Sequence, residues 1–291
     1  MSPRIFRRFR FAPRAYLAAI LREVRASLGR VAQDRAALIT IIVLILPWWS
    51  LMWLRDNLDW LGSFGEIAAI IVAFWWMSRS GALPAPVVKY PRAETLFAMV
   101  VIAAWMMWRA GICGKLFPFL PADFSCFKNL EWEIVPKVLE MVVLPMGVLF
   151  WLGYRWHWSW RAWWIALPIL LATAAYSVYT HWNDLPKFGQ HTVEYFFAAG
   201  LPEEVIFRAI LLTRLEAWLR NPAWALLVSS VLFGLSHLPI NYLVFTAQNW
   251  REAWITLLTF QMGFGVAFAF AYQRTRNVLP LAVLHALVDA L

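Results

Sequence analysis

Apolar stretches separated by short polar connections recur along most of this 291-residue chain. A helix that crosses a membrane needs about 20 mainly apolar residues. Several of the stretches are shorter than this, so the pattern predicts an all-α, polytopic bundle of transmembrane helices with eight or nine spans. The stretches lie near residues 36–54, 61–77, 96–108, 134–152, 162–179, 193–213, 223–240, 254–272 and 278–291.

The first 35 residues differ from the rest of the chain. They contain nine Arg and two acidic residues, and after Pro13 the apolar residues recur at helical spacing on one face. A basic, one-sided helix is typical of a segment that lies in the membrane interface. The sequence therefore predicts three parts: a basic amphipathic N-terminal segment at 1–35, a transmembrane region of unassigned role at 36–192, and a transmembrane region at 193–291 that holds the candidate chemistry.

Composition and charge exclude several other classes of protein. Hydrophobic residues make up 62% of the chain and charged residues 15%, which lies outside the range of soluble domains. The net charge of +9 does not indicate nucleic-acid binding, because the Lys and Arg residues lie mainly in the termini and connections. Their excess on the side of the N-terminus predicts that this end is cytoplasmic. We expect an integral protein of a bacterial inner membrane.

Two adjacent carboxylates and an arginine interrupt the apolar stretch near 193–213. Glu204 and Arg208 are four residues apart, in the order that favours an ion pair on one helical face. Glu203 points about 100° away and is left to face a cavity. Ionisable residues inside a span are costly and therefore functional candidates. The alternative is a buried ion pair that only fixes helix packing.

Two histidines lie in the apolar stretches that follow. His237 ends the sequence Phe233-Gly-Leu-Ser-His, and His285 stands four residues before Asp289, on the same helical face. A lone histidine in a span is more often a packing residue, but two on neighbouring helices together with an unpaired glutamate favour chemistry. Lys137, in the stretch near 134–152, receives no role because a lysine near a span end reaches the interface.

Three motifs follow one another along these apolar stretches: Glu-Glu-x-x-x-Arg, Phe-x-x-x-His and His-x-x-x-Asn/Asp. Together they resemble the signature of the CAAX prenyl protease and bacteriocin-processing family of intramembrane proteases. The run 274–280, Arg-Thr-Arg-Asn-Val-Leu-Pro, is also similar to the family's approach to its third motif. The resemblance covers about 193–291, and residues before it resemble no family.

The resemblance implies a glutamic-type peptidase without a cofactor. Glu203 would be the general base that takes a proton from water, with His237 polarising that water. Glu204 and Arg208 would form a structural ion pair, and His285 with the residue at 289 would stabilise the oxyanion. This chain has Asp at 289 in place of the commoner Asn. An ionised carboxylate cannot donate a hydrogen bond, so we expect it to orient the neighbouring histidine ring instead.

Other functions are compatible with the same residues. Glu203, His237 and His285 are zinc-ligand types, although no HExxH is present. A proton-coupled transporter would use such groups as a relay, but no inverted repeat is present. A non-catalytic immunity or scaffold protein would keep the motifs for packing. The leading hypothesis is an endopeptidase whose partners are the lipid bilayer and a peptide or protein substrate in the membrane, and not nucleic acid.

Overall fold

The computed structural model describes most of the chain from residue 81 onward. The described residues are 81–113, 134–135, 137–151 and 160–290, with isolated positions at 22, 25, 26, 34, 35, 38–40, 42, 72, 76 and 77. They are helical or lie in connections, and none of them is in a strand. The predicted all-α class is therefore confirmed for this part of the chain. The interfacial helix of 1–35 and the stretches near 36–54 and 61–77 lie largely outside the described residues.

The helices follow one another with few interruptions, and several contain π-helical segments, labelled η. A π segment widens the helix locally and is frequent at functional sites. The elements are α4 (Pro91–Cys113), η1 (Leu139–Val143), α6 (Leu144–Trp151), α7 (Trp160–Thr180), the 3₁₀ turn η2 (Trp182–Asp184), α8 (Leu185–Tyr195), η3 (Phe196–Gly200), α9 (Leu201–Glu204), η4 (Val205–Leu212), α10 (Thr213–Leu219), α11 (Pro222–Ile240), η5 (Asn241–Phe245), α12 (Trp250–Thr256), η6 (Leu257–Gln261), α13 (Met262–Thr275) and α14 (Leu279–Asp289).

Within the described residues, three helices are long and apolar enough to cross a membrane: Ala162–Thr180, Pro222–Phe245 and Trp250–Thr275. Leu139–Trp151 and Leu279–Asp289 are apolar but shorter. Length and composition thus identify membrane spans without confirming the predicted total of eight or nine. The stretch near 193–213 belongs to an unbroken helical run, 185–219, whose centre carries the Glu203 motif.

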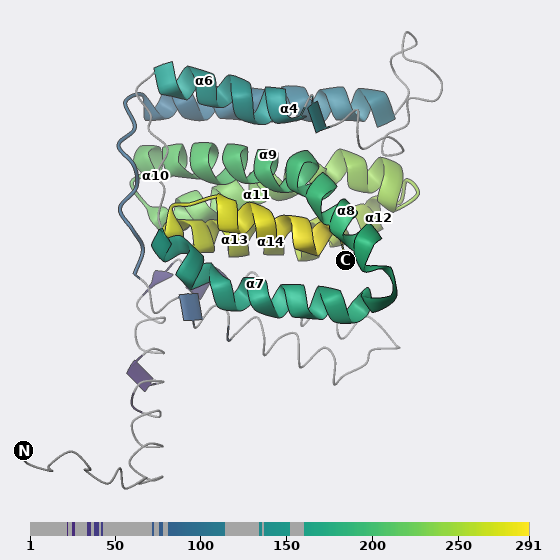
Figure 1. The fold of residues 1–291 in the computed structure, drawn as a ribbon. Coiled ribbons are helices and arrows are strands. Elements are labelled where there is room, and N and C mark those ends of the chain that lie inside the picture. Colours follow the sequence, from purple (N-terminus) through teal and green to yellow (C-terminus); the bar gives the residue numbers. More distant parts are fainter. Residues whose placement is uncertain are drawn as a thin grey trace, which may run out of the picture.

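The layers of the bundle place this run between two outer groups of helices. In Figure 1, α4 and α6 lie on one side of the run from α8 to α10, and α7 lies on the far side of α13 and α14. Small residues permit the close packing of these inner helices. A Cβ at Gly265 of α13 would lie 3.1 Å from the Ser230 Cα of α11, and one at Gly200 of η3 would overlap the Ala282 carbonyl of α14.

Tight turns join the inner helices. Arg220 directly follows α10 and Arg276 directly follows α13, and both have the left-handed conformation, with φ of 52° and 50°. α11 begins at Asn221, whose side-chain oxygen accepts hydrogen bonds from the backbone N–H of Ala223 and Trp224. These turns reverse the chain within a few residues, so that α11 packs against α10 and against α13.

Buried arginines tie the earlier part of the chain to the end of this group. Arg214 of α10 donates to Glu94 of α4 at 2.9 Å. Arg276 pairs with Glu216 at 2.8 Å and donates to the carbonyl of Leu83, also at 2.8 Å. Both arginines are almost completely buried. Their charges hold segments together in addition to any effect on membrane orientation.

Candidate active site

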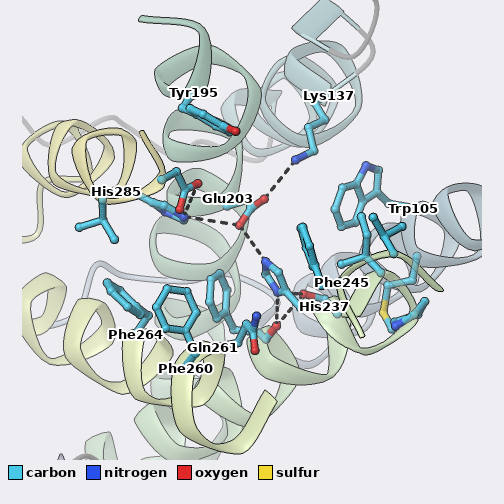
Figure 2. Close-up of a pocket in the computed structure, with 18 residues that line it drawn as sticks. Trp105, Lys137, Tyr195, Glu203, His237, Phe245, Phe260, Gln261, Phe264 and His285 are labelled. Atoms are coloured by element: carbon cyan, nitrogen blue, oxygen red, sulfur yellow. Dashed lines mark hydrogen bonds and ion pairs between the residues drawn. The ribbon is translucent and has the colours of Figure 1, made fainter. Parts of the chain in front are cut away.

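Residues from all three motifs line one cavity of about 450 Å³. Glu203 comes from α9, His237 from α11, and His285 with Asp289 from α14. Figure 2 shows Glu203 at the centre of the group, with His237 and His285 directed toward it from different helices. The structure therefore brings together the residues that the sequence proposed as a site.

The two carboxylate oxygens of Glu203 have different surroundings. Oε1 accepts a hydrogen bond from Nζ of Lys137 at 3.1 Å. Oε2 lies 3.5 Å from Nε2 of His237 and 3.9 Å from Nε2 of His285. Oε2 is buried and has no hydrogen-bond partner among the described residues. One oxygen is thus held by a cation, and the other faces two imidazole nitrogens.

His237 is held by its own helix. Its Nδ1 lies 2.8 Å from the carbonyl oxygen of Phe233 and 3.2 Å from the hydroxyl of Ser236. A carbonyl oxygen only accepts, so Nδ1 carries the proton in this arrangement. In the neutral ring, Nε2 then presents a lone pair to the cavity. The Phe-x-x-x-His spacing supplies this backbone acceptor because residues four apart lie on one helical face.

Phe233 also covers the structural ion pair. Its ring centroid lies 4.6 Å from Cζ of Arg208 and 4.7 Å from the ring of His237. Arg208 and Glu204 are fully buried, with 3.2 Å between Nε and Oε2. The ring thus contacts both the guanidinium and the imidazole, which gives the phenylalanine of the motif a physical role.

His285 is oriented by a contact that the sequence did not reveal. Its Nδ1 lies 3.1 Å from Oε1 of Glu204, and its Nε2 lies 3.5 Å from Oδ2 of Asp289. Glu204 therefore contacts both Arg208 and His285, and its carboxylate oxygen accepts a hydrogen bond from Nδ1–H. Asp289 stands near the ring, as its spacing predicted, but Glu204 makes the shorter contact. Nε2 faces the cavity, where it donates when the ring is protonated.

Residues 190–291 match the family model described as Type II CAAX prenyl endopeptidase Rce1-like. The resemblance drawn from the three motifs is confirmed over this segment. Searches of curated proteins and of solved structures found no match to the chain.

Part of the cavity lies outside the Rce1-like segment. Lys137, just before η1, and Trp105, of α4, line it beside Glu203. The ammonium of Lys137 lies 4.9 Å from the centroid of the Trp105 ring. Sequence reasoning noted the charge of Lys137 but assigned it no role. In the sequence, Lys137 is marked only by its charge inside an apolar stretch, because its partner, Glu203, is 66 residues away.

The donor groups of the cavity bear on the zinc alternative. Among the residues that the structure describes, no group of three or more His, Cys, Asp or Glu side chains could hold a metal ion. The positively charged ammonium of Lys137 already pairs with one carboxylate oxygen of Glu203. Metal analysis of the pure protein tests the zinc alternative.

Proposed function

We propose that this protein is an intramembrane endopeptidase that hydrolyses a peptide bond with a water molecule activated by Glu203 and His237. The observation that carries the proposal is the pair formed by Glu203 Oε2 and His237 Nε2. These atoms face each other at 3.5 Å inside the cavity, and Oε2 has no hydrogen-bond partner among the described residues. Two acceptors in this arrangement suit a water molecule that donates one O–H to each.

The reaction then needs only these groups and the substrate. Glu203 takes a proton from the water as the water oxygen bonds to the carbonyl carbon, and the carbonyl electrons move to oxygen. His285, protonated at Nε2, donates to that oxyanion. When the carbon–nitrogen bond breaks, Glu203 returns the proton to the leaving amine. The products are a carboxylic acid and an amine, which accounts for every atom of the peptide and water.

The remaining motif residues support the catalytic groups. Glu204 accepts a hydrogen bond from Nδ1–H of His285, and its negative charge is balanced by Arg208. Asp289, 3.5 Å from Nε2 of His285, restrains the other side of the ring. The ring is thus positioned by two carboxylates from separate helices, which directs Nε2 toward the substrate.

The cavity walls favour a substrate with apolar groups. Aromatic side chains at 245, 260 and 264 line the cavity, and a second, largely apolar cavity of about 520 Å³ shares Phe260, Phe264 and Val288 with it. The matching family is described as a type II CAAX prenyl endopeptidase. We therefore propose a membrane-associated peptide with an attached isoprenoid as the substrate class. We also propose that the protein lies in a bacterial inner membrane with its N-terminus in the cytoplasm, as the sequence predicts.

The direct test uses purified protein in lipid nanodiscs. The substrate is a farnesylated peptide that ends in a CAAX sequence, with a fluorophore and a quencher on either side of that sequence. Glu203→Gln and His237→Ala should each lower kcat by about 10²- to 10⁴-fold, the usual contribution of general acid–base groups. Both proteins should still accumulate in the membrane. Glu252→Gln, on the exposed surface of α12, and His191→Ala, in α8, are the matched controls and should cleave normally.

Two results would contradict the proposal. A Glu203→Gln protein that cleaves the peptide at the wild-type rate would show that Glu203 is not the general base. Stoichiometric zinc in the pure protein, with activity lost on chelation and restored by zinc, would favour the metallopeptidase. Comparison of protein N- and C-termini in cells with and without the gene would then identify natural substrates.

A further inference from the structure

We infer that Lys137 is a positioning residue for Glu203, and that the part of the chain before the family-matched segment thereby completes the active site. This inference rests on the proposed function, since it assigns Lys137 a role through the proposed base. Glu203 and Glu204 are neighbours in sequence, yet each has its own cation from a different element. Arg208 pairs with Glu204, and Lys137 pairs with Glu203.

The contacts of Lys137 fix its ammonium in place. The side chain is 10% exposed and that of Glu203 is 4% exposed, so the pair is largely removed from water. Nζ lies 3.1 Å from Oε1 of Glu203 and 4.9 Å from the centroid of the Trp105 ring of α4. A lysine ammonium is strongly hydrated, and it remains buried only where such partners replace water. A lysine at a span end that reached the interface would instead be exposed.

The pairing orients the base. A glutamate side chain rotates about its terminal bond, and either oxygen is able to face the cavity. Because Lys137 takes Oε1, Oε2 is directed toward Nε2 of His237 and Nε2 of His285. Asp289 is a further charged group beside Glu203, and its negative charge would repel an unpaired carboxylate. The ammonium of Lys137, 3.1 Å from Oε1, offsets this repulsion.

The test replaces Lys137 and measures cleavage of the same farnesylated peptide in nanodiscs. Lys137→Met keeps the length of the side chain and removes its charge. We expect kcat to fall by about 10- to 100-fold with KM nearly unchanged, since displacement of a reacting group by about 1 Å costs this much. Lys137→Arg should recover part of kcat because it restores the cation. Lys187→Met is the matched control, as it removes an exposed lysine 3.9 Å from Asp184.

A thermal-unfolding cycle gives a readout that does not depend on activity. Lys137→Met leaves the buried carboxylate of Glu203 without its cation, so Tm should fall. In a Glu203→Gln background the same substitution should lower Tm by less, because no charge is stranded. Equal Tm losses in the two backgrounds would overturn the inference whatever the activity.

The outcomes separate the two proposals. If Glu203→Gln is inactive but Lys137→Met has wild-type kcat, the positioning role is wrong and the proposed function stands. If Glu203→Gln cleaves as fast as wild type, the proposed function is wrong. A loss of kcat in Lys137→Met that Lys137→Arg does not relieve at all would show that charge is not the reason, and would also overturn the inference.

Discussion

Gly200 lies at a close helix contact between two parts of the proposed active site. It lies in η3, three residues before Glu203, and packs against Ala282 of α14, three residues before His285. A Cβ built on Gly200 would overlap the carbonyl oxygen of Ala282 and lie 3.3 Å from its carbonyl carbon. Both groups are backbone, so neither is able to rotate away. We predict that Gly200→Ala forces η3 and α14 apart.

The size of the effect follows from that overlap. Carbon and oxygen atoms in contact need about 3.5 Å, so the helices must separate locally by about 1 Å. Overpacking of this kind costs about 1–3 kcal/mol of stability. The 3.1 Å contact between Glu204 and His285 would lengthen, and a displaced catalytic group costs about 100-fold in rate. Gly200→Ala should therefore lower both Tm and kcat while the protein still inserts in the membrane.

The assay compares Gly200→Ala with Gly189→Ala in α8. A Cβ at Gly189 would meet no atom within 4 Å. This control should keep full activity and gain up to about 1 kcal/mol of stability from the helix propensity of alanine. The measurements are peptide cleavage in nanodiscs and Tm of the same preparations. Wild-type kcat and Tm in Gly200→Ala would refute the reasoning, because they would show that the helices are not packed as closely as the structure has them.

Two further predictions concern the residues around the base. Arg208→Ala should lower the amount of folded protein, since it strands the buried carboxylate of Glu204 at a cost of about 3–5 kcal/mol; normal accumulation, measured by membrane immunoblot, would contradict this. Asp289→Asn should remain active with a pH profile parallel to wild type, because Asn keeps an acceptor beside His285. Curves that diverge as pH rises would instead assign position 289 a donor role, and complete inactivity of a well-folded protein would contradict both roles.

Contacts within one helix were predictable from spacing. Glu204 and Arg208 are four residues apart and form the expected ion pair at 3.2 Å. His285 and Asp289 have the same spacing, and their polar atoms lie 3.5 Å apart. Helical geometry alone places such residues on one face. The regularity survives even though Arg208 lies in η4, where the π turn changes the phase of the helix.

Contacts between helices were not predictable from a single sequence. Glu204 contacts His285 across 81 residues, and Lys137 contacts Glu203 across 66. Spacing has no bearing on such pairs, because they depend on how the tight turns and close helix contacts bring separate elements together. The buried pair of Arg214 and Glu94 belongs to the same class. Arginine near the end of an apolar stretch suggests a solvated charge. Its burial is explained by the contact with Glu94 of α4 together with hydrogen bonds to Ala209 and Thr213.

The boundary that the sequence predicted near residue 193 marks where the family motifs begin. Contacts between side chains cross this boundary at several points. Arg214 pairs with Glu94, and Trp105 and Lys137 line the cavity that holds Glu203. If Lys137 positions the base as inferred, the motif-bearing segment alone would contain a buried carboxylate without its cation. The earlier helices then contribute to catalysis as well as anchorage, and variation in them would tune the base without altering any of the three motifs.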